Sequence, residues 1–320
     1  MPKVSVIIPT HNREQFIARA IDSVLAQTFT DYEIIVVDDG SIDLTRDVLR
    51  AYDNRIKYVY QENKGVSAAR NLGIRESTSQ YIAFLDSDDY WAPEKLELQV
   101  EVLDKHDNVG IVFGRMPILN ERGEILGMKP NGISGRDFQE LLRVWGDLPT
   151  SSVMTRRECF DRLGVFDETL PPMEDIDMWL RIARHYDLHE IEGKTLAYYW
   201  RHEEQITRDP IKVYSGLVKI YAKILKNYDD IPHDLIIRRL VSNQYMLSRN
   251  YYFKKRYVEA FKNVAVAIGR YPSVGDLFFM SDDNLFKKCV TLIKPYGFLI
   301  VCLTKVCFSF IQNASKNGKS

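Results

Sequence analysis

Three aspartates stand within four residues at 86–89, where the chain reads Asp-Ser-Asp-Asp. Carboxylates this close repel one another unless a cation lies between them. Mg²⁺ and Mn²⁺ bind carboxylate and phosphate oxygens together, and such an ion neutralises charge on a leaving diphosphate. The cluster follows an apolar run at 81–85, which places it at the end of a predicted buried strand. The pattern therefore favours a Mg²⁺ or Mn²⁺ site that grips a phosphate-bearing donor over the alternative, a solvated turn with an aspartate at a helix cap.

Two further polar groups follow predicted strands. Pro-Thr-His-Asn at 9–12 comes after the β-branched run at 4–8, and Asp-Asp-Gly-Ser at 38–41 comes after the run at 33–37. Ligands of open α/β sheets bind outside the carboxyl ends of the strands, so we expect these groups and the aspartate cluster to face one site. A carboxylate at 38 or 39 can accept hydrogen bonds from a base N–H or a ribose hydroxyl. An ordinary strand-ending turn is the alternative, since it uses the same residue types.

The segment Asn63-Lys64-Gly65 precedes a predicted helix over 65–75. Gly65 permits close approach of the backbone to a ligand, and the helix start offers positive potential through Lys64 and Arg70. A plain helix start is the alternative interpretation.

The pair Glu174-Asp175 opens another predicted helix, because apolar residues follow it at helical spacing. Asp175 is then in the first turn, where the helix dipole favours its ionised form. An ionised carboxylate beside a hydroxyl group can remove its proton as that hydroxyl attacks. Capping of the helix is the alternative role.

These groups must be positioned by elements that alternate between strand and helix, which predicts a mostly parallel sheet with helices on both faces. Asn12 is the expected cap of the first helix, with Gln15 completing a capping box, and Pro93 is expected to open the fourth. The predicted strands cover residues 4–8, 33–37, 56–60, 81–85, 109–113 and 152–154, with helices over 43–52 and 65–75 and a hairpin over 120–127 that turns at Arg122-Gly123.

Four segments together resemble family 2 glycosyltransferases of the GT-A fold, over about the first 205 residues. They are VSVIIPTHN at 4–12, VVDDGS at 36–41, NKGVSAARN at 63–71 and FLDSDD at 84–89. The resemblance implies an α/β, Rossmann-like GT-A fold. It also implies an inverting enzyme that moves a sugar from a nucleotide-diphosphate sugar, most simply a UDP-sugar, to a saccharide or lipid-linked acceptor in the synthesis of surface polysaccharide or glycoconjugates.

The resemblance also implies individual roles. Asp39 should contact the base, and Asp88 should be the central donor and metal residue, with Asp86 and Asp89 assisting. Asp175 should be the base of a single in-line displacement. His202, near a strand end, should meet the metal or the diphosphate, with a surface histidine as the alternative. The donor-binding set is Pro9, Thr10, Asp38, Asp39, Asn63, Gly65, Arg70, Asp86, Ser87 and Asp88, and the acceptor side is Thr150, Ser151, Glu174 and Trp179.

The rest of the chain sets wider bounds. A catalytic domain is expected over 1–205 and a helical extension over 206–320. The chain is helical in pattern from Pro210, and an apolar helical period over 252–271 loosely resembles one tetratricopeptide-like hairpin. A formal net charge of −1 argues against binding nucleic acid by bulk charge.

The cysteines and the N-terminus indicate a reducing, cytoplasmic setting. The four cysteines form no CxxC pair, which fits neither a zinc site nor a disulfide framework. The apolar stretch at 4–8 is too short for a secretory signal.

The segment 284–320 contains no Asp or Glu and six lysines, four of which share one helical stripe. It predicts an in-plane helix that binds the anionic cytoplasmic face of the inner membrane peripherally. A helix packed on the protein's own core is the alternative, and no oligomeric state is predicted.

Two other functions are weighed against the transferase. A sugar-phosphate nucleotidyltransferase needs a glycine-rich loop after the first strand, and residues 9–12 contain no glycine. A non-catalytic nucleotide-sugar-binding protein of the same fold would have lost carboxylates, whereas Asp39, Asp88 and Asp175 are all present.

Overall fold

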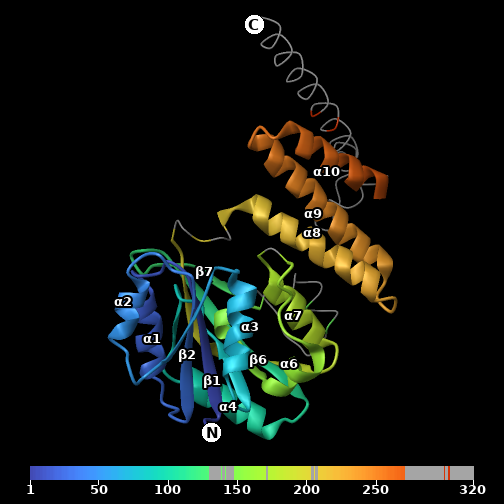
Figure 1. The fold of residues 1–320 in the computed structure, drawn as a ribbon. Helices are drawn as coiled ribbons and strands as arrows, with labels where there is room; N and C mark the ends of the chain where they lie inside the picture. Colours follow the sequence, from blue (N-terminus) through green and yellow to red (C-terminus); the bar gives the residue numbers. More distant parts are fainter. Residues whose placement is uncertain are drawn as a thin grey trace, which may run out of the picture. The chain divides into compact units, whose positions relative to one another are not determined.

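The computed structural model describes residues 1–129, 148–170, 172–202 and 208–270, together with residues 138, 141, 205, 299 and 302. The chain divides into two compact units (Figure 1). The α/β unit comprises Met1–Thr169 and Glu174–Glu203, and the helical unit comprises Leu170–Met173 and Glu204–Ser320.

The first half of the α/β unit is a parallel sheet. Its strand order is β3-β2-β1-β4, and every neighbouring pair in that order is parallel. The two central strands are buried on both faces, which explains their continuous apolar runs. The elements are β1 (Val4–Thr10), β2 (Tyr32–Asp39), β3 (Lys57–Gln61), β4 (Tyr81–Phe84), α1 (Ile17–Leu25), α2 (Thr45–Arg50), α3 (Val66–Glu76) and α4 (Lys95–Lys105).

Alternate residues of β2 divide the core between the two faces of the sheet. Ile34 and Val36 belong to the large cluster that includes residues of α1, α2 and α4, whereas Ile35 and Val37 pack with Ala69 of α3. This is the period-2 alternation of a strand. Helix α3 lies close against the sheet at Gly73, where a Cβ atom would be 2.4 Å from a methyl carbon of Ile7.

The second half of the unit mixes strand directions. Strand β8 is antiparallel to both β4 and β6, whereas β9 and β10 run parallel to β6. The predicted hairpin is present, with Gly123 at φ 78° and its N–H donating to the carbonyl of Asn120. The elements are β5 (Tyr90–Trp91), β6 (Val109–Leu119), β7 (Ile125–Lys129), the 3₁₀ turn η1 (Thr150–Ser152), β8 (Met154–Arg156), α6 (Arg157–Leu163), α7 (Glu174–Ala183), β9 (Asp187–Thr195) and β10 (Ala197–Trp200).

The predicted cap at Asn12 is wrong. Helix α1 begins at Ile17, and Asn12 adopts a left-handed φ of 51° five residues earlier. Its backbone N–H donates to Ser41 Oγ, and its Oδ1 accepts from the N–H of Ile42. Asparagine tolerates this conformation because its short polar side chain bonds locally. Asn12 therefore ties the loop after β1 to the loop after β2 instead of starting a helix.

Other element bounds also differ from the sequence-based expectations. In the expected strand over 152–154, Ser152 belongs to the turn η1, and the strand begins only at Met154. Pro93 lies two residues before the first residue of α4 instead of opening it, and the short strand β5 was not predicted. Strand β6 extends six residues past the predicted 109–113.

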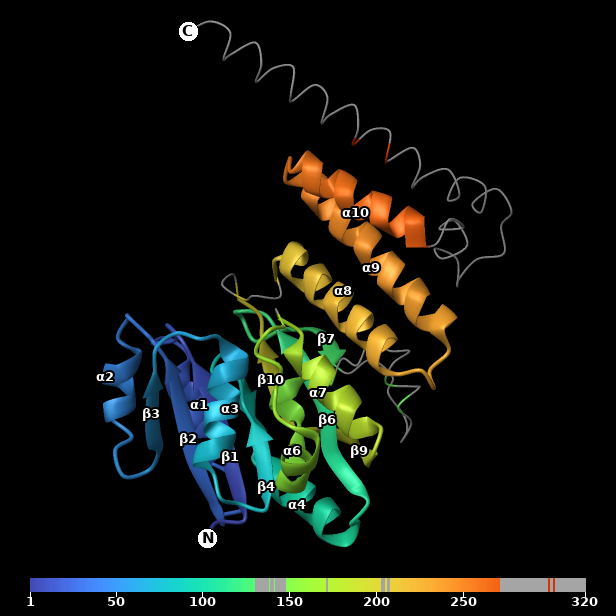
Figure 2. The same ribbon diagram turned by 45° about the vertical axis from the view of Figure 1, so that its right-hand side comes forward.

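The helical unit contains α8 (Pro210–Asn227), α9 (His233–Phe253) and α10 (Tyr257–Arg270). Asp209 caps α8 by accepting from the N–H of Ile211, and proline occupies the first turn, where its missing N–H costs nothing. The helical period over 252–271 is interrupted, since α9 ends at Phe253 and Lys255 takes a left-handed φ of 59°. Helices α9 and α10 then pack side by side as a hairpin (Figure 2).

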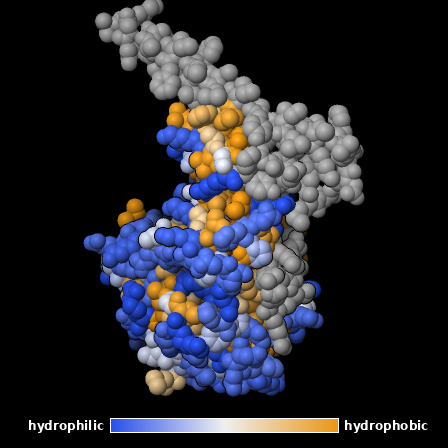
Figure 3. All heavy atoms as spheres, turned by 90° about the vertical axis from the view of Figure 1, so that its right-hand side faces the viewer, coloured by the Kyte–Doolittle hydropathy of each residue, from blue (hydrophilic) through white to orange (hydrophobic). Residues whose placement is uncertain are grey.

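None of the helices in the part of the chain that the structure describes is long and apolar enough to cross a membrane. The lysine-containing segment 284–320 lies outside the described residues, apart from residues 299 and 302. On the face drawn in Figure 3 the described α/β unit is mostly hydrophilic, and hydrophobic residues appear only in small areas.

Candidate active site

The three polar groups of the first half lie at one edge of the sheet. Strand β1 lies between β2 and β4, and its last residue, Thr10, is in register with Asp38 of β2. The chain leaves β4 with the N–H of Leu85 bonded to the carbonyl of Ile7, directly before residues 86–89. Adjacent parallel strands therefore deliver residues 9–12, 38–41 and 86–89 to the same edge, as expected of an open α/β sheet.

Asp38 and Asp39 are buried and hold the loops that surround them. Asp38 accepts from the Ser41 N–H and the Tyr58 hydroxyl, at 2.8 and 2.9 Å. Burial and this hydrogen bond to Asp38 raise the pKa of Tyr58 to about 12. Both carboxylates are at the end of β2, and β2 lies beside β1 in the sheet.

The Asp39 carboxylate binds the segment that precedes α3. It accepts from the N–H groups of Lys64 and Gly65, each at 2.8 Å, and from Gln61 Nε2 at 2.6 Å. The described residues therefore fill three of its roughly four acceptor positions. Gly65 has φ 90°, a conformation that favours glycine, and so the turn into α3 can bring two N–H groups to one carboxylate.

The remaining donor residues of the first strand and of the turn before α3 lie beside this carboxylate. Pro9 and Thr10 are buried at the end of β1, and the Thr10 hydroxyl has no hydrogen-bond partner among the described residues. The Asn63 side-chain nitrogen lies 3.2 Å from His11 Nε2, and His11 Nδ1 lies 2.9 Å from the Asp39 carbonyl oxygen. His11 thus links the loop after β1 to Asp39 and to the turn before α3.

The three aspartates of the carboxylate loop, residues 86–89, have different surroundings. Asp86 accepts from Arg70 Nη2 at 2.8 Å. Asp89 is 2% exposed and accepts from Ser151 Oγ at 2.6 Å and from the Trp200 N–H at 3.2 Å. Burial, with Asp88 and Asp86 nearby, raises the pKa of Asp89 well above its usual value. Asp89 thus has protein donors on both oxygens and holds the loop, and its place among the metal ligands stays a prediction.

Asp88 is intermediate in exposure between Asp86 and Asp89, and it pairs with a histidine. Its Oδ2 lies 2.9 Å from His202 Nε2, and its side chain is 17% exposed. Its backbone carbonyl accepts from Arg19 Nη2 at 2.9 Å. His202 is buried and packs on the Phe16 ring, with ring centroids 4.6 Å apart, so it is not a surface histidine. The neighbouring Ser87 is buried.

Arg19 is a residue that sequence reasoning missed. Its guanidinium carbon lies 4.9 Å from the centre of the Tyr90 ring and 4.2 Å from that of Trp200. Desolvation lowers the pKa of Arg19, while Tyr90, Asp89 and Asp88 oppose that shift. The available signal was an arginine within the run of apolar residues that forms the buried face of α1, from Ile17 to Ile21. A planar guanidinium suits a position between aromatic rings.

Arg70 lies inside the protein between two carboxylates instead of facing a ligand. It donates to Asp86 on one side and forms a short ion pair with Glu174 of α7 on the other. Arg70 is 4% exposed and Glu174 is 4% exposed. Burial lowers the pKa of Arg70, but Asp86 and Glu174 together outweigh burial and raise it above the usual value. Arg70 therefore connects the carboxylate loop to the start of α7.

Asp175 is partly buried in the first turn of α7. Its Oδ2 accepts from Thr150 Oγ1 at 2.8 Å, and its Oδ1 accepts from the Ile176 N–H at 2.9 Å. Burial, followed by the charge of Glu174, raises the pKa of Asp175 to about 6, against the opposing effects of Arg70 and the two hydrogen bonds. Burial, the largest cause of the shift, acts against the helix dipole, which favours the ionised carboxylate. The carboxylate is still mainly ionised at pH 7.

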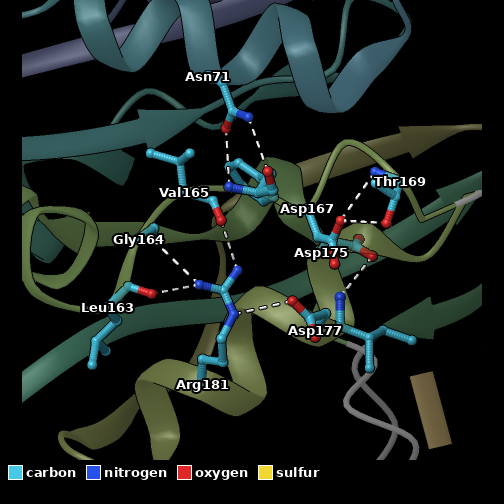
Figure 4. Close-up of polar contacts among 11 residues, drawn as sticks. Asn71, Leu163, Gly164, Val165, Asp167, Thr169, Asp175, Asp177 and Arg181 are labelled. Atoms are coloured by element: carbon cyan, nitrogen blue, oxygen red, sulfur yellow. Dashed lines mark hydrogen bonds and ion pairs between the residues drawn. The ribbon is translucent and has the colours of Figure 1, made fainter. Parts of the chain in front are cut away.

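The segment that leads toward α7 is fixed by side chains from two helices (Figure 4). Asn71 of α3 exchanges two 2.9 Å hydrogen bonds with the backbone of Phe166. Arg181 of α7 donates to the carbonyls of Leu163 and Val165, each at 2.7 Å, and to Asp177 at 3.0 Å. Because Asn71 follows Arg70 in α3, one helix holds both this segment and the carboxylate loop.

The predicted acceptor-side residues are buried. Trp179 is 0% exposed and packs at an angle against the rings of Phe84 and Phe166, so its side chain faces the core in this structure and its contact with an acceptor stays a prediction. Thr150 and Ser151 are 4% and 1% exposed, and their hydroxyls bond to Asp175 and Asp89. The turn η1 therefore bridges the carboxylate loop and α7, and its hydroxyls are not open to an acceptor.

Asp88 and His202 are the residues best placed to hold a metal ion. Among the residues that the structure describes, no three His, Cys, Asp or Glu side chains gather as a metal-binding group. A carboxylate and an imidazole are nonetheless a suitable pair for Mn²⁺, and Mg²⁺-type sites often take one or two protein ligands with substrate phosphates supplying the rest. The donor set fits an ion that is completed by a diphosphate.

A mixed α/β sheet of the GT-A type with carboxylates at the strand ends defines a class of nucleotide-sugar enzymes. The family model described as glycosyl transferase family 2 matches residues 5–164 of this chain. The chain belongs to that family and is a glycosyltransferase enzyme.

Two curated relatives illustrate the range of the likeness. An uncharacterized glycosyltransferase of Rickettsia felis is 36% identical over 195 residues, which cover 59% of this chain. The match spans 32% of that relative, so this chain corresponds to about a third of its length. The UDP-Glc:alpha-D-GlcNAc-diphosphoundecaprenol beta-1,3-glucosyltransferase WfgD of Escherichia coli is 31% identical over 264 residues, covering 81% of this chain and 97% of WfgD.

Solved structures share the fold. TarS residues 1–349 from S. aureus, in complex with UDP-GlcNAc, matches with a TM-score of 0.66 and 21% identity, covering 97% of this chain and 92% of TarS 1–349. The mannosyltransferase PcManGT of Pyrobaculum calidifontis, in complex with GDP-Man and Mn²⁺, matches with a TM-score of 0.58 and 18% identity, covering 95% and 86%.

Proposed function

We propose that this chain transfers a sugar from a UDP-sugar to a lipid-linked saccharide with inversion at the anomeric carbon, and that Asp175 is the general base. The observation that carries the proposal is a double connection between Asp175 and the carboxylate loop. The turn η1 bonds Asp175 through Thr150 and Asp89 through Ser151. Arg70 links Asp86 to Glu174, the residue next to the base. Donor loop and base are thereby held in one arrangement.

The chemistry of the base follows from its surroundings. As the acceptor hydroxyl oxygen bonds to the anomeric carbon, its proton passes to the Asp175 carboxylate, and the bond from that carbon to the diphosphate oxygen breaks. The leaving group keeps the electron pair. Attack opposite the leaving group inverts the configuration. A pKa of about 6 suits a base that must be ionised at neutral pH and still bind a proton in the transition state.

Asp88 and His202 would hold a Mn²⁺ or Mg²⁺ ion together with the donor diphosphate. Such an ion, when bound, neutralises charge on the leaving diphosphate. The pair distance of 2.9 Å supports this assignment, as does the Mn²⁺ in the complex of PcManGT. Asp86 supports the loop through Arg70, and Asp89 supports it through Ser151.

The proposed nucleotide site lies at the ends of β1 and β2. Asp39 keeps one open acceptor position for a base N–H, and the unpaired Thr10 hydroxyl lies buried at the end of β1. The uridine assignment is supported by the donors in the names of two similar proteins, UDP-Glc for WfgD and UDP-GlcNAc for TarS.

The proposed acceptor is a saccharide on a lipid diphosphate, by similarity to WfgD, whose named acceptor is of that kind. The lysines of segment 284–320 support a peripheral position on the anionic cytoplasmic face of the inner membrane. Sedimentation of the full chain with vesicles tests this position. We expect binding to phosphatidylglycerol vesicles that falls with salt, and equal binding to phosphatidylcholine vesicles would contradict it.

The test of the function uses UDP-glucose and UDP-GlcNAc with Mn²⁺ and a GlcNAc-diphospholipid acceptor. We expect UDP release that depends on metal and acceptor, with a β-linked product from the α-linked donor by NMR. Asp175→Asn should reduce the rate by about 10²–10⁴-fold. The matched control is Asp47→Asn, a surface carboxylate paired with Arg50. Full activity of Asp175→Asn, or retention of configuration, would contradict the proposal.

A further inference from the structure

Gln99 of α4 is a fully buried amide whose hydrogen bonds are all made. Its Nε2 donates to the backbone carbonyls of Val112 and Ser152, each at 2.8 Å. Its Oε1 accepts from Lys95 Nζ at 2.6 Å. Only one orientation of the amide satisfies these partners, because a lysine amine on one side donates and two carbonyls on the other accept.

Lys95 supplies the donor that this arrangement requires. Its side chain is 0% exposed and its Nζ lies 4.0 Å from the centre of the Trp91 ring. Burial lowers the pKa of Lys95 well below its usual value. Trp91 in turn donates its indole N–H to the carbonyl of Ser151 at 2.7 Å. Two consecutive carbonyls of the turn η1 are therefore held by side chains buried in the core.

The opposite side of the same turn carries the contacts of the proposed site. Thr150 donates to Asp175, and Ser151 donates to Asp89. The turn has only three residues, so a shift of its backbone must move its hydroxyls. From this geometry we propose that Gln99, with Lys95 as its donor, is a positioning residue that sets the Thr150 hydroxyl against Asp175. The inference rests on the proposed function in one respect, the role of Asp175 as the base.

Removal of the Gln99 amide has a defined consequence. Gln99→Leu leaves the Ser152 and Val112 carbonyls without their donor, and a buried unpaired carbonyl favours any shift that finds another partner. The Thr150–Asp175 hydrogen bond then lengthens. Because this bond favours the ionised carboxylate, its loss raises the pKa of Asp175. The charged groups that face Asp175, namely Glu174 and Arg70, are unchanged in this variant.

The first measurement needs no substrate. The unfolding free energy is measured from pH 4.5 to 8 for the full chain, Gln99→Leu and Thr150→Val, each with and without Asp175→Asn. In the parent chain Asp175 binds its proton more tightly when folded, so its contribution to stability falls as pH rises to about 6. In Gln99→Leu and Thr150→Val we expect the unfolding free energy to keep falling to a pH about half to one unit higher. Asp175→Asn should abolish the extension.

The control is Gln27→Leu. Gln27 is a buried glutamine of the same unit that donates to two backbone carbonyls, Ser23 and Ala92, and accepts one backbone N–H, yet it does not bond to η1. It should lower stability with no change in the pH range of the fall. If Gln99→Leu does not fold, Gln99→Met with Lys95→Met removes the amine that lost its acceptor. An unchanged pH range in the Gln99 variants would overturn the positioning role.

The second measurement is the pH profile of UDP release from the donor with Mn²⁺. Gln99→Leu should move the acid limb of kcat to higher pH as Thr150→Val does, and the double variant should move it no further than either single one. If Gln99→Leu lowers kcat but leaves the acid limb of its pH profile unmoved, the inference is overturned. Failure of the proposed function has another signature, since the parent chain would then lack an acid limb or Asp175→Asn would keep its rate.

Discussion

Arg70 and Glu174 form an ion pair in the interior of the α/β unit, and each side chain is only 5% exposed. The same guanidinium bonds Asp86 at 2.8 Å, so one arginine neutralises a carboxylate of the loop and a carboxylate of α7. A planar fork can serve two carboxylates at once, which a single ammonium on a shorter-reaching stem does poorly.

Arg70→Lys should therefore be costly despite its retained charge. We expect a loss of about 2–4 kcal/mol in unfolding free energy by chemical denaturation, since a buried carboxylate is left with a poor partner. Arg50→Lys, which alters the exposed i,i+3 pair with Asp47, is the control and should cost no more than about 0.5 kcal/mol. Equal costs for the two variants would show that the interior pair has no special weight.

Asp175→Asn should stabilise the protein while it removes activity. The folded state raises the pKa of this carboxyl to about 6, so the protein carries an unfavourable charge at pH 7 that asparagine lacks. After allowance for its partial exposure, we expect a gain on the order of 1 kcal/mol, or about 2–4 °C in Tm by calorimetry. Asparagine can still accept from Thr150. A fall in Tm would mean that the charge is favourable where it stands.

The rate of transfer should rise with pH through about 6 and level off above it. Asp175 accepts a proton only when ionised, so lowering the pH through its pKa removes the base. Stability should change in the opposite sense over the lower part of this range, because the protonated carboxyl is the form that the folded state favours. A kcat independent of pH between 5 and 8 under saturating donor would count against this assignment.

Metal affinity should separate Asp88 from Asp89 in the carboxylate loop. In the presence of UDP, His202→Ala should weaken Mn²⁺ binding by about tenfold, and Asp88→Asn should weaken it at least as much. Asp89→Asn should leave Mn²⁺ affinity within about twofold, because Ser151 and the Trp200 N–H already occupy that carboxylate. Electron paramagnetic resonance of free Mn²⁺ gives the affinities directly. The assignment fails if Asp89→Asn is the variant that loses the metal.

Much of the architecture follows from local pattern. The runs 4–8 and 33–37 are continuous and β-branched because both faces of their strands are covered. Because ligands of such sheets bind at the carboxyl ends of the strands, the sequence alone predicts that residues 38–41 and 86–89 lie at one edge. The predictions are wrong where residues distant in the sequence supply partners that a local motif does not reveal. Asn12 has the sequence of a helix cap, but Ser41 and Ile42 supply its partners from another loop.

The different partners of the individual carboxylates could not be predicted from the spacing of residues in the sequence. Ser151 lies 62 residues from Asp89, and Glu174 lies 104 residues from Arg70. The burial of Trp179 could not be predicted from spacing either. Its position in α7 is equally compatible with a side chain that faces the core and with one that faces a ligand. The pKa of Asp175 also depends on neighbours that the helix alone does not provide.

The amino-acid sequence by itself determined the family, the alternation of strands and helices, and the edge of the sheet that carries the candidate site. Only the tertiary structure decided which carboxylate pairs with His202, which one holds a loop and which one at the start of α7 has a raised pKa. The reason is physical. A carboxylate's availability and proton affinity are set by its desolvation and by the donors around it, and in this fold Arg70, Thr150, Ser151 and His202 come from separate elements that meet only after the sheet has formed.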